Sequence, residues 1–464
     1  MTLDLSSSLR AAAPTSPEAL AGTKKEAGTT RLLSTFDIMA LIVGAVIGAG
    51  IFSSPALVAA NAASTQDAFI GWALGGLIAV AGALCYAELA TAHPHMGGEY
   101  HYLRLAFGEK VGFLFAWARL TVIPTGSIAL LGYVFGDYAT QLHRLGEFSP
   151  AVYAAIMIVL MTGLNVLGLR CGACTQKVLT LLVVAGILLI VAAGLTLASP
   201  SPVPMAEPAT PAEATQWGLI LVFVMLSYGG WNEAAYVSAE VNGPNRRLPR
   251  ALFWSLAIVT AAYLLLNAAL FRMLDLAGTG ASTAVAADAM RALMGEPGAR
   301  LVSVLIAVAA LASVNATILL GARTTYAFGR DEPMFGFLGH WSIRHQAPVR
   351  ALLVQAAIAL LLVALGGLTH SGFKTMVEYT APVFWLFFVL TGLALFVLRA
   401  RRPDHPRPFR VPAYPFIPLV FVASSGYLLY ASLVHTGIGA LVGLAVLAAG
   451  VLLLLVRKRA APRA

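Results

Sequence analysis

The stretch Val43-Gly44-Ala45-Val46-Ile47-Gly48-Ala49-Gly50-Ile51-Phe52 lies in the first long apolar segment of the chain. Its three glycines fall within seven residues, and each costs a helix interior about 1 kcal/mol relative to alanine. In lipid, an opened helical turn is tolerated only where it is buried in protein or lines a cavity. The stretch therefore predicts either a helix that breaks inside the membrane or close helix packing through small residues, and glycine alone does not choose between them.

The composition indicates an all-α polytopic membrane protein. Of 464 residues, 59% are hydrophobic and 11% are charged, whereas soluble domains carry about 25% charged residues. The longest polar stretch between apolar segments lies near residues 329–348. Because this leaves no room for a soluble catalytic domain, we expect function to be carried out within the membrane, with no enzymatic activity and no nucleic-acid partner.

Twelve apolar segments meet or approach the length of about 20 residues that a helix needs to span the hydrocarbon. They are residues 36–61, 68–91, 109–138, 149–169, 175–198, 216–240, 250–272, 298–328, 350–367, 373–398, 412–433 and 436–457. Residues 1–33 lack the apolar region of a signal peptide and are rich in Ala, Ser, Thr and Pro. We expect them to form a disordered cytoplasmic tail.

The placement of basic residues supports an even number of spans. With both termini in the cytoplasm, 24 of the 30 Lys and Arg residues fall inside, and one, Arg119, lies within a span. The five outside are Arg144, Arg272, Arg291, Arg300 and Lys374. This asymmetry follows the positive-inside rule. The basic clusters, including the tail at 458–464, are therefore interpreted as orientation signals, with lipid head-group binding as a secondary role.

A second interruption strengthens the interpretation of the first as a break. The sixth segment carries Ser227-Tyr228-Gly229-Gly230-Trp231-Asn232-Glu233, five spans after the first interruption. Paired glycine-interrupted segments in corresponding positions are typical of transporters built from inverted repeats. Freed N–H groups at a half-helix N-terminus suit an anionic group, and freed carbonyls at the other half-helix's C-terminus suit a cation. An α-amino acid zwitterion matches both.

With these motifs in view, the chain resembles the amino acid–polyamine–organocation (APC) superfamily, and within it the L-type amino acid transporter family. The resemblance covers about residues 35–340 and is specific as a set rather than by any single motif. It is carried by Gly48-Ala49-Gly50-Ile51-Phe52, Cys85-Tyr86-Ala87-Glu88-Leu89, Gly97-Gly98-Glu99-Tyr100, Tyr228-Gly229-Gly230-Trp231-Asn232 with Glu240-Val241, and the segment 315–323.

The resemblance implies twelve helices in the LeuT-like arrangement, with two inverted five-helix repeats and discontinuous helices 1 and 6. The first repeat would cover residues 34–200 and the second residues 216–398, with two further helices in 410–457. For a transporter of this kind we also expect no cofactor and no covalent chemistry.

The resemblance further implies a substrate site at the two interruptions. The substrate carboxylate would meet the N–H groups of Gly48, Ala49 and Gly50, next to Ile51. The ammonium would meet carbonyls of the first and sixth helices. Trp231 would contact the substrate side chain or gate its path, and Asn232 would support the unwound turn. The carbonyls expected to meet the ammonium belong to Val43, Gly44, Ala45, Val46, Ser227, Tyr228 and Gly229. Gly230 would complete the sixth-helix turn.

Coupling and gating residues depart from the family pattern. Members often carry a lysine in the fifth helix at a sodium position, where this chain has Val183, and Lys177 lies at the membrane edge. Ser313 and Thr317, beside Asn315 in the eighth helix, could offer oxygens to sodium or water. Helix–helix hydrogen bonding is the commoner role of such side chains.

Arg119 lies about ten residues into the third span, roughly mid-bilayer. A charge there must face protein or water and is usually functional. A structural ion pair, a gate or substrate contact, and misplaced span ends all remain open, with Glu88, Asp137, Glu233 and Glu378 as candidate partners. Glu88 and Glu240 lie near inner helix ends, where we expect pairing with loop arginines, and Asp37 begins the first span, where an acid favours the helix dipole.

Cysteines and histidines do not indicate a metal or a disulfide. Cys171 and Cys174 form a lone C-x-x-C without further zinc ligands, and the loop run His93, His95 and His101 contains Pro94. Animal members join a heavy chain through a cysteine between helices three and four, and residues 139–150 contain none. We therefore expect no disulfide-linked partner. Tyr133 and Tyr138 are interpreted as packing residues or interfacial anchors.

These features predict a secondary transporter of neutral α-amino acids that works by alternating access, as a permease or an exchanger. A carrier of another cationic or polar amine, a non-translocating sensor and a passive channel are the alternatives. The Ala-, Leu- and Arg-rich composition suggests a bacterial inner (plasma) membrane. The sequence predicts neither the particular amino acid nor the oligomeric state.

Overall fold

The computed structural model describes residues 39, 42–44, 46–95, 97–167, 172–198, 213–233, 247–342, 344–345, 347–434 and 437–456, with the backbone alone at 172–180, 233, 247 and 456. Regular structure in these residues is helical, apart from one isolated bridge between Ser342 and Ala347. Ala45, Asp37, Glu240 and Cys171, and the side chains of Cys174, Lys177 and Glu233, lie outside the described part.

Nine helical segments of the described chain are long and apolar enough to cross a membrane. They are α3 (Thr65–Ala92), α5 (Glu109–Thr121) with α6 (Ile123–Leu142), α7 (Ser149–Val166), α11 (Arg247–Ala281), α12 (Val285–Asp331), α13 (Val349–Leu368), α14 (Gly372–Arg401), α15 (Phe416–Val434) and α16 (Ile438–Val456). The polytopic helical class predicted from composition is confirmed.

The remaining elements are shorter or only partly described. The helices α8 (Gly172–Thr196) and α9 (Trp217–Ser227) are apolar, and α2 (Ser54–Ala60) and α4 (Gly98–Phe107) are brief. Three 3-10 turns complete the set, namely η1 (Ala49–Phe52), η2 (Trp231–Glu233) and η4 (Pro333–Gly339). Of the twelve predicted segments, the three without a full-length described span are 36–61, 175–198 and 216–240, and two of these carry the glycine interruptions.

One interruption inside a predicted helical segment was not anticipated. Between α5 and α6, Val122 leaves helical geometry at φ −115° and ψ −56°, two residues before Pro124. Asp275 interrupts α11 with φ 58°, and Gly295 interrupts α12 with φ 69°, both between the predicted segments 250–272 and 298–328. Proline lacks the N–H that a continuous helix needs, so the third predicted span is two stacked helices rather than one.

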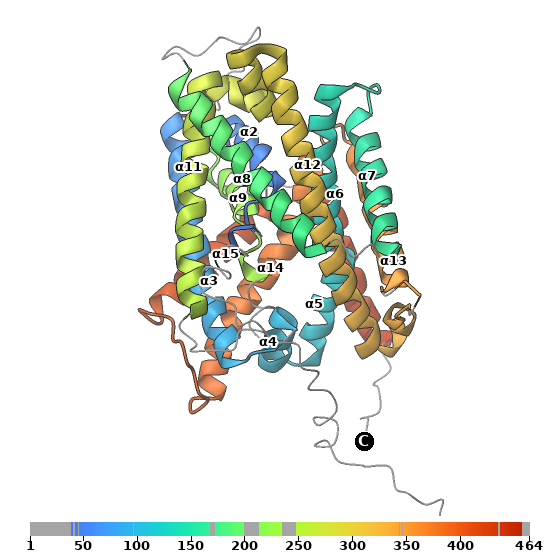
Figure 1. Cartoon of the computed structure of the whole chain (residues 1–464). Coiled ribbons are helices and arrows are strands. Elements are labelled where there is room, and N and C mark those ends of the chain that lie inside the picture. The colour runs from blue at the N-terminus through green and yellow to red at the C-terminus, as the bar shows by residue number, and fades with distance from the viewer. Residues whose placement is uncertain are drawn as a thin grey trace, which may run out of the picture.

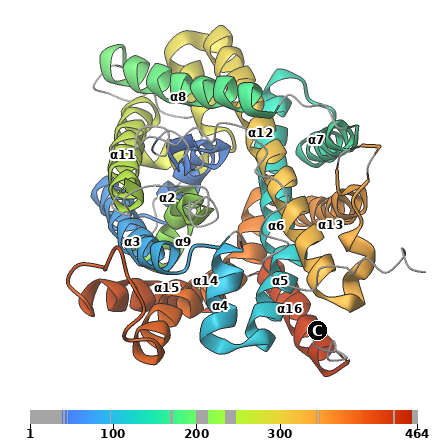
Figure 2. The ribbon, with the colours of Figure 1, turned by 60° about the horizontal axis from the view of Figure 1, so that its bottom comes forward.

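The helices form two neighbouring groups (Figures 1 and 2). In one, α2 and α9 lie side by side, with α3 packed on α9 and α11 packed on α2, α3 and α8. In the other, α6 packs on α7, α12 and α13. The helix α14 contacts α6, α15 and α16, and α4 lies across the lower end of the molecule in Figure 1. The two interrupted segments are thus enclosed by full-length helices.

Glu88, in the last turn of α3, ties this helix to the connection between α14 and α15. Its carboxylate accepts hydrogen bonds from Arg399 Nε at 2.7 Å and from the Val411 N–H at 2.7 Å. Arg407 Nε lies 3.7 Å away. The expectation that Glu88 pairs with arginines near a helix end is confirmed, and Glu88 is not the partner that Arg119 would need.

Candidate functional site

The first glycine-rich stretch is a broken helix. The Ile47 N–H donates to Val43 O and the Gly48 N–H donates to Val46 O, each at 2.8 Å. Gly48 is then extended, at φ −101° and ψ 179°, before η1 begins. A Cβ added at Gly50 would meet nothing within 4 Å. Close packing therefore does not explain that glycine, and the break is the better of the two interpretations.

The second stretch breaks in a different way. The helix α9 ends at Ser227, and the Tyr228 and Gly229 N–H groups donate back to Val224 O at 3.2 Å and Leu226 O at 3.1 Å. Gly230 adopts φ 105°, in the left-handed region that favours glycine. The chain resumes as η2 at Trp231. Both interruptions predicted from the sequence are therefore present.

Tyr263 of α11 joins the two breaks. Its hydroxyl lies 3.1 Å from Val46 O and 2.9 Å from Ser227 O, and the residue is fully buried. Since a tyrosine hydroxyl has one hydrogen, it shares that hydrogen between the two carbonyls. The final carbonyl of each helical piece is thus held at the same point, although 181 positions separate Val46 from Ser227 in the sequence.

An aromatic layer holds Tyr263 in place. Its ring packs against Trp72 at 5.6 Å and against Tyr228 at 5.2 Å between centroids. The Tyr228 hydroxyl donates to Trp72 O at 3.0 Å. The Tyr228 side chain therefore serves the packing of α3, α9 and α11, and only its backbone lies at the break.

On the other side of the second break, Trp231 belongs to a second aromatic cluster. Its ring meets Tyr86 at 5.0 Å, Phe388 at 5.4 Å and Phe421 at 6.2 Å between centroids. The Tyr86 hydroxyl donates to Glu99 of α4. Because α3, α4, α14 and α15 all contribute, this cluster closes the end of the molecule at which α4 lies.

Two polar groups at the second break are buried without a partner. Ser227 Oγ and Trp231 Nε1 have no hydrogen-bond partner among the described residues. Buried donors are usually satisfied, and each exception calls for an explanation. A polar ligand between the two breaks would supply one. Asn232 is also buried here.

The first break is anchored at its far end by Tyr138 of α6. The hydroxyl donates to Phe52 O at 2.7 Å and accepts from the Ala286 N–H at 3.3 Å. The tyrosine was interpreted from sequence as a packing residue or interfacial anchor. It is fully buried in the core, as a packing residue is, and its hydroxyl also links the end of η1 to the start of α12.

The candidate coupling residues lie on two sides of α12. Ser313 faces the break, since a Cβ on Gly48 would lie 3.6 Å from Ser313 Oγ. The Ser313 and Thr317 hydroxyls donate to carbonyls one turn earlier in their own helix, at 3.2 and 2.9 Å. Asn315 Oδ1 instead accepts from Asn165 Nδ2 of α7 at 2.7 Å. Asn315 is thus a link between helices rather than part of the breaks.

The two remaining candidates are buried in other helices. Val183 is buried in α8, and Arg119 is buried in the C-terminal turn of α5, where the exposed carbonyls favour a cation. The described residues hold no group of three or more His, Cys, Asp or Glu side chains arranged for a metal. His93 stacks on His405 and His95 stacks on His101 instead.

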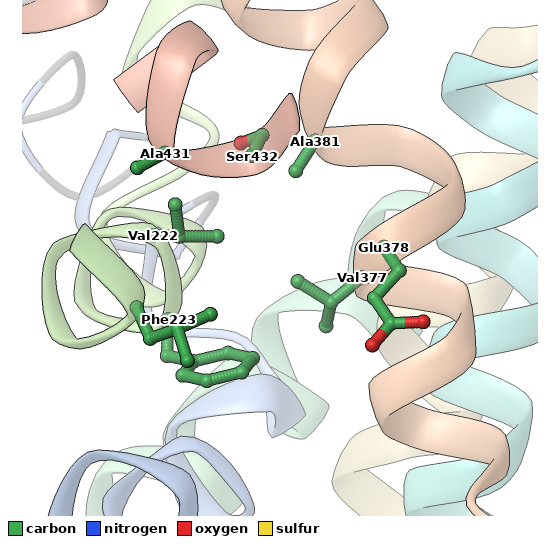
Figure 3. Close-up of a pocket in the computed structure, with 8 residues that line it drawn as sticks. Val222, Phe223, Val377, Glu378, Ala381, Ala431 and Ser432 are labelled. Atoms are coloured by element: carbon green, nitrogen blue, oxygen red, sulfur yellow. The ribbon is translucent and has the colours of Figure 1, made fainter. Parts of the chain in front are cut away.

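A separate pocket lies beside the first half of α9 (Figure 3). In this view Phe223 of α9 and Val377 of α14 face one another across it. The lining residues are Leu219, Val222, Phe223, Val377, Glu378, Ala381, Ala431 and Ser432. None of them belongs to either break, so this pocket is not the candidate site.

Comparison with known proteins agrees with this arrangement. The chain is 33% identical to the b(0,+)-type amino acid transporter 1 of Rattus norvegicus, over 85% of this chain and 81% of that protein. It is 33% identical to the large neutral amino acids transporter small subunit 2 of Homo sapiens, over 94% of this chain and 82% of that protein. It is 29% identical to the serine/threonine exchanger SteT of Bacillus subtilis, over 91% of this chain and 95% of that protein.

The family profile described as amino acid permease extends over nearly the whole chain. It matches residues 33–455, from the first apolar segment to the end of α16. The match includes both broken helices, Tyr263 and the helices packed around them. The chain belongs to the amino acid permease family.

Proposed function

We propose that this protein is a secondary transporter of neutral α-amino acids that works by alternating access, as an exchanger or a permease. The observation that carries the proposal is the meeting of two broken helices at the Tyr263 hydroxyl. Family membership supports it, as do relatives named for neutral amino acids and for serine/threonine exchange.

The substrate ammonium would bind where the helical carbonyls converge. Ser227 O accepts from Tyr263 and keeps a second lone pair for the ammonium, whereas Val46 O accepts from both Tyr263 and the Gly48 N–H. The negative ends of two helix dipoles also meet at this point. Val43, Gly44 and Ala45 precede Val46 in the chain, and Tyr228 and Gly229 follow Ser227.

The substrate carboxylate would bind at the start of η1. The first two N–H groups of a 3-10 helix, here those of Ala49 and Gly50, have no intrahelical partner. The Gly48 N–H already donates to Val46 O, so we assign it to shaping the break rather than to the substrate. Trp231 with its neighbouring aromatics would close one access path.

We propose twelve transmembrane helices with two inverted five-helix repeats, in 34–200 and 216–398, followed by two helices in 410–457. Corresponding helices of the two halves pack on each other, namely α3 on α11, α6 on α12 and α7 on α13. Pseudo-twofold symmetry between repeats favours such pairing. Both termini would lie in the cytoplasm of a bacterial inner membrane, and no disulfide-linked heavy chain would be required.

Counterflow in proteoliposomes tests the function. Vesicles loaded with unlabelled neutral amino acids should accumulate an external labelled one without a sodium or proton gradient. Uptake only after such a gradient is imposed would make the protein an ion-coupled symporter, with Ser313 beside Gly48 as the first coupling residue to substitute. Saturable binding without accumulation would favour the sensor, and uptake without counterflow would favour the channel.

A further inference from the structure

A basic pocket lies at the end of the molecule that carries α4. It is lined by Pro249 and Arg250 from the first turn of α11, and by Pro408, Phe409 and Arg410 from the connection between α14 and α15. Figure 1 shows this connection, in orange, at the lower left of the molecule. Two arginines from segments about 160 positions apart therefore border one depression.

Neither arginine side chain is bonded to another residue of the described chain. No side-chain hydrogen bond or ion pair among the described residues involves Arg250 or Arg410, and both side chains are exposed. Glu88, the acid that reaches this connection, already accepts from Arg399 and from the N–H of Val411. The first turn of α11 contains no acidic residue, and its helix dipole adds positive potential. Among the described residues, no acidic side chain pairs with either guanidinium group, so this part of the pocket is positively charged.

The pocket lies at the level of the membrane surface. The span of α11 begins at Leu248, and that of α15 begins at Phe416. From Arg250, an exposed apolar stripe runs along α11 through Trp254, Ile258 and Leu265, which are 57%, 48% and 48% exposed. Their spacing of four and seven residues keeps them on one helix face. A ligand in the pocket would therefore meet two arginines at one end and the apolar, lipid-facing side of α11 next to them.

We propose that this pocket binds the phosphate of an acidic phospholipid, with Arg250 and Arg410 as its two cationic contacts and the α11 stripe beside its acyl chains. Guanidinium groups match phosphate oxygens in geometry and charge. The positive-inside distribution assigns this end to the cytoplasmic leaflet, and basic pockets on that side of membrane proteins suit acidic head groups. A soluble phosphate would offer the same anion, but the adjoining apolar stripe favours the lipid.

Lipid binding to the purified full-length chain in neutral detergent tests the proposal without any transport assay. Dioleoylphosphatidylglycerol, dioleoylphosphatidylcholine and inorganic phosphate are titrated separately, and bound lipid is counted by native mass spectrometry. Phosphatidylglycerol should bind in preference to phosphatidylcholine. Arg250→Gln or Arg410→Gln should each weaken its binding about fivefold, and the double variant about thirtyfold.

The matched control is Arg402→Gln, which removes an exposed charge from the same connection but outside the pocket. Its affinity should stay within about twofold of the wild type. Equal binding of both phospholipids, or an unchanged affinity in the double variant, would overturn the proposal. Displacement of the lipid by millimolar inorganic phosphate would overturn the lipid as the source. The single variants decide the matter if the double variant does not fold.

Discussion

At the scale of single residues, the site depends on one hydroxyl that no sequence pattern marks. Tyr263 lies in an ordinary apolar stretch of α11, yet its oxygen is 3.1 Å from Val46 O and 2.9 Å from Ser227 O. The two glycine stretches could be predicted, because glycine has a local conformational cost. Tyr263 could not, because its role exists only when three distant segments meet.

Replacing Tyr263 with phenylalanine should lower counterflow about tenfold and destabilise the protein by about 1–3 kcal/mol. The ring packing would survive, but the hydroxyl that joins Ser227 O to Val46 O would be lost, and Val46 O would keep only the Gly48 N–H. The checks are initial uptake rates and melting temperature. Tyr427→Phe, at an exposed tyrosine of α15, is the control and should behave as wild type. Normal transport by Tyr263→Phe would show that the hydroxyl does not organise the site.

The two break glycines should respond differently to substitution. Gly230 has φ 105°, so Gly230→Ala should lower both stability, by about 1–3 kcal/mol, and transport. Gly48 is extended and a Cβ there would meet Ser313 Oγ at 3.6 Å. Gly48→Val should therefore fold and insert normally, while its methyl groups fill the space beside the N–H groups of η1 and abolish transport.

Uptake and melting temperature of the purified variants separate these effects. Gly163→Ala, in α7, is the control because an added Cβ would meet nothing within 4 Å. Full transport by Gly48→Val would remove the argument that substrate binds at the first break.

At the scale of elements, the end of the molecule near α4 is held by polar contacts that the sequence indicated only in part. The pairing of Glu88 with arginines was predicted from its place near a helix end. The additional Val411 N–H contact and the stacking of His93 on His405 at 4.4 Å were not, since they depend on how the α14–α15 connection folds back. The break at Val122 was missed, although Pro124 gave a local signal.

Glu88→Gln should destabilise the protein by about 3 kcal/mol, because it leaves buried arginines without their carboxylate. Glu88 is 3% exposed and Arg407 is 7% exposed at the side chain. The control is Glu109→Gln. The side chains of Glu109 and its partner Arg104 are 64% and 49% exposed, so losing this pair should lower the stability by less than about 1 kcal/mol. Melting temperatures in detergent give the comparison, and equal losses in the two variants would contradict it.

Acid should weaken this same region. Burial, with His405 as a secondary cause, lowers the pKa of His93 to about 4, and burial, with His95 next, lowers the pKa of His101 to about 4. The unfolded chain binds these protons near pH 6.5, so stability should fall as the pH drops from about 6.5 to about 4 and change little above that window.

Melting temperature as a function of pH measures this loss. His93→Gln should reduce the slope between pH 6.5 and 4, whereas His340→Gln, at an exposed position, should leave it unchanged. A slope that does not respond to His93→Gln would contradict the assignment.

At the scale of the whole molecule, hydropathy predicted the class of fold because spanning length is a local property of the sequence. Nine predicted spans correspond to full-length helical segments. The segments around 36–61 and 216–240 do not, because their glycines divide the apolar run into shorter pieces. The relative position of the two breaks is a property of packing, set by the contacts of α9 with α2 and η1 and by Tyr263 of α11.

The central claim is that the two breaks bind the ammonium and the carboxylate common to all α-amino acids. The most direct test is competition in the counterflow assay, using the best-transported amino acid together with its methyl ester and its N-acetyl derivative. We expect the unmodified amino acid to compete and both blocked forms to be at least about tenfold weaker, since each loses one charge. If either blocked form competes as well as the free amino acid, the corresponding break does not bind the substrate's main chain.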